Sequence, residues 1–113
     1  MNKDFALFQS EFKKWQKLFG LTGYRVYYES KPLANRFATV LYDLPTMSVS
    51  VTLNSNLPRE LSRHKNARRS AKHEACHLLI ARLDDCAQTR YVTREIINEA
   101  TEELAVKLES LIP

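Results

Sequence analysis

Two histidines, His73 and His77, lie four residues apart in a segment that contains no helix-breaking residue. The stretch from Arg59 to Asp84 has neither glycine nor proline, and Asn56 to Pro58 has the residues typical of a helix start. The segment therefore predicts one helix from Arg59 to about Asp84. Because residues four apart share a helical face, both imidazoles should point in the same direction.

Helical periodicity also appears at both ends of the chain. Aromatic residues recur at three- and four-residue steps near the start, at Phe5, Phe8, Phe12, Trp15 and Phe19. Gly20 follows them as a stop signal. A last helix is predicted from about Thr93 to Leu111, with an inward apolar stripe of Ile97, Ala100, Leu104, Leu108 and Leu111.

The residues between the first two helices change to a strand period. Strand-forming residues cluster at 24–28, at 37–42 and at 47–53, where apolar and polar side chains alternate. Lys31-Pro32 and Leu44-Pro45 mark turns between them. Because the connections are short, we expect a small antiparallel sheet of about three strands. The 113 residues thus predict a single α+β domain spanning 1–113.

Charge and cysteine content indicate the cellular location of the protein and the class of its binding partners. The net charge is +4, with 17 basic and 13 acidic residues, which is compatible with nucleic acid or an acidic partner. Six bases fall in the run 59–72, at Arg59, Arg63, Lys65, Arg68, Arg69 and Lys72. No apolar run approaches the length that crosses a bilayer. The first residues do not resemble a signal peptide and the two cysteines read as free thiols, so we expect a cytoplasmic protein.

The segment His73-Glu74-Ala75-Cys76-His77 has the spacing H-E-x-x-H on its predicted helix. Two imidazoles on one helical face can reach one metal ion, and nitrogen ligands suit Zn²⁺. Glu74 flanks the same face, from which it can contact a metal-bound water without ligating the metal. The pattern predicts a zinc site in which Glu74 is a general base.

A catalytic zinc needs a third protein ligand. His64 is nine residues before His73, which places it on nearly the opposite side of one straight helix. We therefore expect a carboxylate from the last helix. On a helical wheel Glu99 and Glu103 flank the apolar stripe and either is a candidate ligand, whereas Glu95, Glu102 and Glu109 lie further out and are expected to be solvated.

The two motifs together resemble the gluzincins, the thermolysin-like zinc peptidases. Ile97-Asn98-Glu99-Ala100, with an acid at Glu103, is similar to their second signature. The resemblance implies that Glu99 is the third zinc ligand and that Glu103 and Asn98 support the site, with Glu103 bonded to a ligating histidine. The short chain is most similar to single-domain metallopeptidases of phages and bacteria. The motif also resembles that of SprT-like peptidases, but no histidine follows His77 to supply their third ligand.

This resemblance implies a zinc-dependent metallopeptidase that hydrolyses peptide bonds in peptide or protein substrates with a zinc-activated water. The strand before the metal helix would hold extended substrate by strand addition, through the backbone around Ser48, Ser50 and Thr52. Tyr91 is the candidate catalytic group that stabilises the oxyanion. The same strand pattern also fits an ordinary solvated strand, and Tyr91 also fits a packing residue.

A non-catalytic reading is the alternative. In it, zinc stabilises a small binding module, and the basic run 59–72 contacts nucleic acid or an acidic protein. Such a structural zinc would need a fourth protein ligand, which is not obvious in the sequence. The sequence therefore favours the catalytic interpretation, and it leaves the oligomeric state open.

Overall fold

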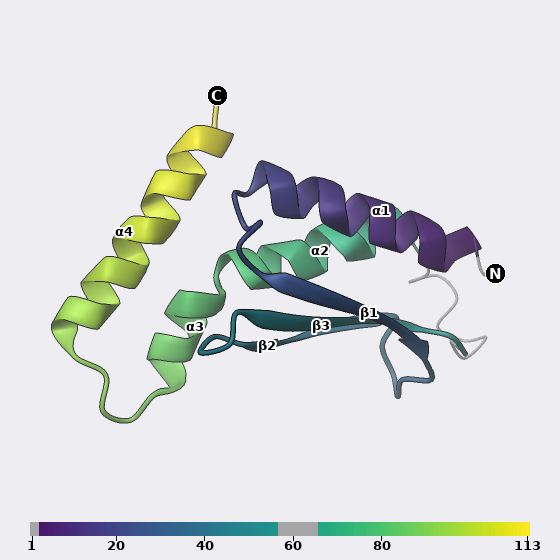
Figure 1. The fold of residues 1–113 in the computed structure, drawn as a ribbon, viewed down its shortest axis with the longest axis horizontal. Helices are drawn as coiled ribbons and strands as arrows, with labels where there is room; N and C mark the ends of the chain where they lie inside the picture. The colour runs from purple at the N-terminus through teal and green to yellow at the C-terminus, as the bar shows by residue number, and fades with distance from the viewer. Residues whose placement is uncertain (1–2, 57–65) are drawn as a thin grey trace.

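The computed structural model describes residues 3–56 and 66–113, in which an N-terminal helix precedes a sheet and further helices (Figure 1). The elements are α1 (Lys3–Leu18), β1 (Arg25–Lys31), β2 (Ala38–Asp43), β3 (Ser48–Asn54), α2 (Ala67–Leu79), α3 (Ala81–Gln88) and α4 (Arg94–Leu111). The predicted α+β class and the order helix, sheet, helices are confirmed. None of the described helices is long and apolar enough to cross a membrane.

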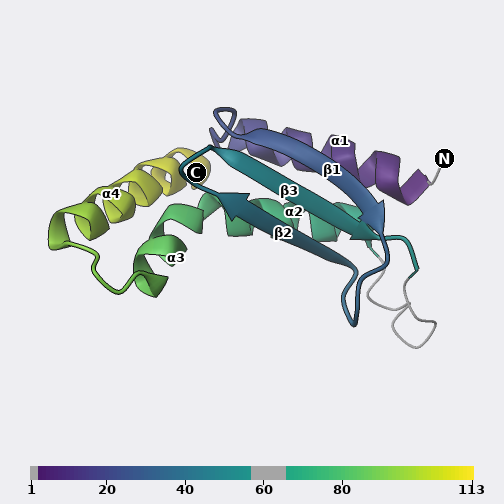
Figure 2. The same cartoon turned by 60° about the horizontal axis from the view of Figure 1, so that its bottom comes forward.

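The sheet is mixed, so the prediction of an antiparallel sheet is wrong in one of its two pairings. The strand order is β1-β3-β2, with β1 parallel to β3 and β2 antiparallel to β3 (Figure 2). Short connections predicted a meander because they normally join neighbouring strands. Here the β1–β2 connection instead passes beyond the end of β3, which becomes the central strand, and β2 forms an edge.

A buried asparagine at the end of β3 holds that connection. The Asn54 side chain accepts hydrogen bonds from the backbone N–H of Leu33 at 3.1 Å and of Asn56 at 2.9 Å. Its amide donates to the carbonyls of Leu33 at 3.0 Å and of Arg36 at 2.7 Å. Since a buried amide is costly unless it is bonded, these four bonds fix the crossover. Nothing in the strand pattern distinguished Asn54 from a turn residue.

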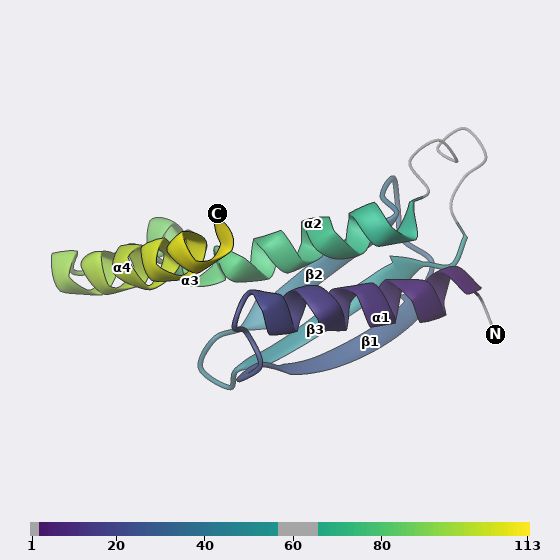
Figure 3. The same ribbon diagram turned by 90° about the horizontal axis from the view of Figure 1, so that it is seen from above.

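Helices α1 and α2 lie side by side on one face of the sheet (Figure 3). Between these layers Phe8 and Phe12 from α1 are fully buried against Val51 and Leu53 of β3. The predicted stop after α1 is confirmed. Gly20 has φ +71°. Its N–H donates to Lys17 O at 3.1 Å and that of Leu21 to Gln16 O at 2.9 Å, the bonds of a Schellman ending.

The single helix predicted from Arg59 to about Asp84 is two helices where the structure describes it. Asn66 caps α2 by accepting a hydrogen bond from Arg69 N at 3.0 Å, and residues 57–65 lie outside the described part of the chain. The chain turns at Ile80, whose ψ of 5° departs from helical values. Neither glycine nor proline marks this turn, so the sequence pattern did not reveal it.

The last helix begins where it was predicted, but its apolar stripe is only partly buried. Thr93 Oγ1 accepts a hydrogen bond from Ile96 N at 3.2 Å and caps α4. Of the predicted inward stripe, Ala100 is buried, whereas Ile97 is 39% and Leu108 38% exposed. Helix α4 extends with α3 beyond the end of α2 (Figures 1 and 3), so the sheet does not cover it.

Candidate metal centre

Helix α2 places both motif histidines on its exposed side. The Nε2 atoms of His73 and His77 are 3.2 Å apart, and the ring centroids are 4.8 Å apart with the rings nearly perpendicular. Both side chains are exposed. The prediction that the two imidazoles share one face is confirmed, and solvent can reach the nitrogens.

Glu74 lies beside the two histidines on the same turn, but its side chain is buried where theirs are exposed. It is 7% exposed and forms no hydrogen bond with the described residues. Burial raises the pKa of its carboxyl group, while the nearby His77, His73 and Arg36 act in the opposite direction. A carboxyl group that holds a proton more readily than usual suits a residue that must accept and return one.

Glu74 lies between two hollows that run along the edge strand β2. One, of about 350 Å³, is lined by Glu74 and His77 from α2, by Asp84 from α3, and by residues 39–42 of β2 with Arg36. The other, of about 340 Å³, is lined by Glu74, His73 and Arg69 together with residues at the start of β2. The motif side chains and the edge strand therefore border the same surface depression.

A tyrosine–aspartate pair in the first hollow was not anticipated. The Tyr42 hydroxyl donates a short hydrogen bond to Asp84 Oδ2. Burial, followed by this bond, raises the pKa of Tyr42 to about 12. The bond from Tyr42, a bond from Gln88 and the charge of His77 lower the pKa of Asp84. Asp84 is seven residues after His77, but the chain turns at Ile80 between them, so helical spacing alone could not have identified it.

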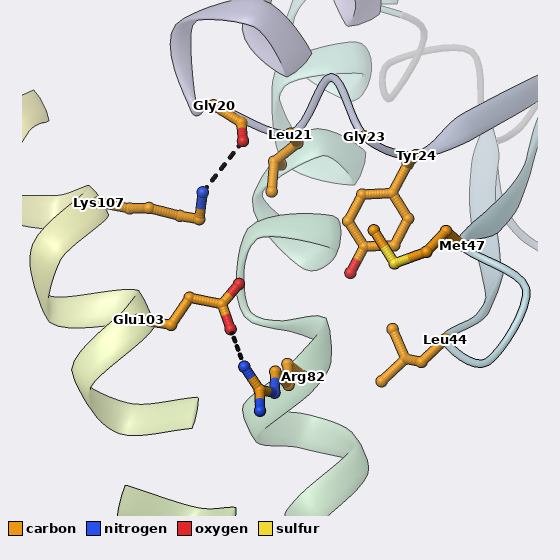
Figure 4. Close-up of a pocket in the computed structure, with 9 residues that line it drawn as sticks. All are labelled: Gly20, Leu21, Gly23, Tyr24, Leu44, Met47, Arg82, Glu103 and Lys107. Carbon is orange, nitrogen blue, oxygen red and sulfur yellow. Dashed lines mark hydrogen bonds and ion pairs between the residues drawn. The ribbon is translucent and has the colours of Figure 1, made fainter. Parts of the chain in front are cut away.

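The carboxylates predicted to complete the site face an arginine instead. Arg82 of α3 contacts Glu103 Oε2 at 2.7 Å and Glu99 Oε2 at 3.0 Å. Figure 4 shows Glu103 and Arg82 pointing toward one another across a hollow, with Lys107 bonded to Gly20 O nearby. Within residues 3–56 and 66–113, no three His, Cys, Asp or Glu side chains gather as a metal-binding group. Neither Glu99 nor Glu103 lies together with the two histidines.

The other candidates on α4 and before it stand apart from the hollows. Asn98 is exposed on α4. Tyr91 is 81% exposed, and its nearest described partner is the Arg90 guanidinium, 5.2 Å from the ring centroid. It lines neither hollow beside the motif. The geometry supports neither predicted role of Tyr91. A packing residue would be buried, and an oxyanion donor would line a hollow beside the motif.

The strand that was predicted to receive substrate lies at the centre of the sheet. Ser48, Ser50 and Thr52 lie on β3, whose backbone pairs with β1 on one side and β2 on the other. A central strand has no free edge to receive a peptide, so strand addition at these residues is excluded. The strand that is both at the edge and beside the motif is β2. The alternation of polar residues predicted a strand correctly, but it carries no information on whether that strand is central or at an edge of the sheet.

The basic run is described only in its second half. Arg59, Arg63 and Lys65 fall outside the described residues, while Arg68, Arg69 and Lys72 are exposed on α2. Both cysteines are free, as predicted; Cys86 is buried and Cys76 is exposed.

The two imidazole nitrogens of the motif have a spacing that fits zinc, but they are only part of a ligand set. Two nitrogens bound to one tetrahedral Zn²⁺ at 2.0–2.1 Å should be about 3.3 Å apart, close to the 3.2 Å between the two Nε2 atoms. The same separation also suits a hydrogen bond between two neutral imidazoles. The spacing of the pair suits chelation, but a third ligand from α4 would require that helix or its side chains to move.

Comparisons with protein-family models, with curated proteins and with solved structures found no match. The resemblance to gluzincins therefore rests on the two sequence motifs.

Proposed function

We propose that this chain is a zinc-dependent metallopeptidase. The observation that supports the proposal is the geometry of α2, where two exposed imidazole nitrogens lie 3.2 Å apart beside a buried glutamate with a raised pKa. His73 and His77 would hold the ion, with Glu99 or Glu103 as third ligand after release from Arg82. Zinc bound in this way supplies Lewis acidity and lowers the pKa of a bound water toward 7.

Residues of this chain have distinct tasks in that reaction. Glu74 takes the proton of the attacking water and returns it to the leaving amine. The substrate lies extended along β2, the edge strand that borders the hollows, and pairs with its free backbone groups. Tyr42 replaces Tyr91 as the candidate donor to the developing oxyanion, since its side chain lines the hollow and its phenol stays protonated at neutral pH. Its single O–H now donates to Asp84, so this role requires the phenol to exchange that bond for one to the substrate. The two free cysteines fit a cytoplasmic location.

The first test measures zinc and hydrolysis separately. Purified protein should contain one zinc per chain, and His73→Ala should lose it. His64→Ala is the comparison variant, because it removes the one histidine outside the motif: it should keep the metal if α4 supplies the third ligand, and loss of zinc would assign that ligand to His64. Glu74→Gln should keep zinc yet lose hydrolysis of an unfolded, fluorescently labelled protein. Undiminished hydrolysis by Glu74→Gln would remove the general-base assignment, and zinc-free wild type after incubation with excess zinc would remove the proposal.

The non-catalytic zinc-stabilised binding module remains the second candidate. It predicts that Glu74→Gln changes nothing measurable except stability, and that wild type does not hydrolyse any unfolded protein. A structural zinc requires four protein ligands. The described part of the chain offers the two motif imidazoles, so no observation favours this candidate over the first.

A further inference from the structure

Charge is divided unevenly between two parts of the molecule. Helices α1 and α2 together carry seven Lys or Arg against three Asp or Glu, whereas α3 and α4 carry three against seven. The first pair covers the sheet and the second pair lies beyond the end of α2 (Figure 3). The modest net charge of the whole chain therefore conceals a positive layer, which attracts polyanions.

Side chains from both helices meet in this layer around one tryptophan. We call the exposed residues Lys14, Lys17, Arg68, Arg69 and Lys72 the α1–α2 basic face. The Nζ atoms of Lys14 and Lys72 lie 4.9 Å and 4.7 Å from the centroid of the Trp15 ring, so lysines of different helices cover the same indole. Glu11 pairs with Lys14 at 2.8 Å and with Arg68 at 3.5 Å. One acid among five bases leaves a strong positive excess.

The composition of the face favours a phosphate backbone over a protein. Protein interfaces have a core of apolar or aromatic anchors, and here the aromatic Trp15 is covered by lysines. The exposed apolar side chains lie mainly elsewhere, as on α4, where Ile96 is 44% and Val106 52% exposed. Long, exposed lysines act as point charges, which suits repeated phosphates and does not read base edges.

We propose that the α1–α2 basic face binds the phosphate backbone of nucleic acid without sequence preference. This inference does not depend on zinc or on hydrolysis. Arg69 also lines the hollow that contains His73, so the bound nucleic acid would pass beside the candidate metal centre. The sequence indicated only the run 59–72; the lysines of α1 join it because the two helices pack together.

The test is a salt-dependent binding measurement on the full chain in the presence of a chelator. Fluorescence anisotropy of a labelled 20-base-pair duplex should report micromolar binding at 50 mM salt. Four neutralised phosphates would give a slope of log K against log salt of about −3.6. Lys72→Gln should weaken binding roughly eight-fold at 0.1 M salt and reduce the slope by about one. Lys31→Gln on β1 removes the same charge outside the face and should bind as wild type.

Trp15, the only tryptophan of the sequence, reports directly on the face. Its emission should change as duplex is added, with the same midpoint as the anisotropy. Absence of binding at 50 mM salt, or equal losses in Lys72→Gln and Lys31→Gln, would overturn the proposal. If poly-glutamate bound as tightly as the duplex, the face would instead take acidic proteins. Circular dichroism of both variants checks that neither loss comes from unfolding.

Discussion

Replacing Arg82 tests whether α4 supplies the third zinc ligand. Arg82 binds both candidate ligands, Glu99 and Glu103, and a carboxylate held by a guanidinium is less available to a metal ion. The substitution Arg82→Met keeps an aliphatic side chain of similar length and removes the competing charge. If either acid must leave Arg82 to coordinate zinc, the variant should bind zinc more tightly than wild type.

The size of the gain follows from the exposure of the two ion pairs. The side chains of Arg82, Glu99 and Glu103 are 43%, 68% and 40% exposed, so each pair should contribute only about 0.2–1 kcal/mol. Because one acid is the ligand, metal binding breaks one pair and costs about 0.2–1 kcal/mol. Since 1.4 kcal/mol is tenfold in an equilibrium constant, zinc affinity should rise up to about five-fold in Arg82→Met.

Competition titration against a chromogenic chelator measures this change, and two further variants identify the ligand. Of Glu99→Gln and Glu103→Gln, the one that removes the ligand should weaken zinc binding by a factor of ten or more. The other should leave affinity equal or slightly raised, because it frees Arg82 from one acid. Glu109→Gln, on the same helix but without an ion pair to Arg82, is the matched control and should bind as wild type.

Two results would refute the reasoning. Unchanged affinity in Arg82→Met and in both glutamine variants would show that α4 does not complete the site. Lower affinity in Arg82→Met would show that Arg82 positions the ligand and does not withhold it.

Three further predictions follow from the site. Glu74→Gln should raise the melting temperature at pH 7. Because the pKa of Glu74 is raised in the folded protein, ionisation of this residue destabilises the fold at higher pH. The gain should vanish below pH 4.5, where Glu74 is protonated in both the folded and the unfolded protein. Tyr42→Phe should cost about 1 kcal/mol in denaturant unfolding at pH 7. The pKa of Asp84 is lowered, so that loss should shrink as pH falls below 3.8. Zinc should slow amide hydrogen exchange in α4; equal exchange with and without zinc would count against ligation from that helix.

The elements with strong periodicity and recognisable ends were predictable. The aromatic steps of α1 and its stop at Gly20 agree with the structure, and so does the start of α4 after the Thr93 cap. The shared face of His73 and His77 was equally predictable, because it depends on helix geometry alone. Each of these features is local, so neighbouring residues determine it.

Features that depend on distant residues were not predictable in this way. The place of β3 between β1 and β2 depends on a crossover held by Asn54, and a strand pattern carries no information on neighbours. Tyr42 and Asp84 meet from positions 42 residues apart. Arg82 looked like an ordinary helix charge, yet it decides where the two candidate acids point.

The loose attachment of α4 connects its half-buried stripe with the incomplete metal site. Helix α4 is held by the burial of Ala100, by the packing of Leu111 against the core, by two exposed ion pairs to Arg82 and by one hydrogen bond from Lys107 to Gly20. The polar contacts together are worth about 1–4 kcal/mol. A zinc ion on the α2 histidines would draw an acid of α4 away from Arg82 if ligation by that acid were worth more than these polar contacts. If zinc binds as proposed, α4 is therefore the element whose position would change most readily, because Ile97 and Leu108 are already partly exposed.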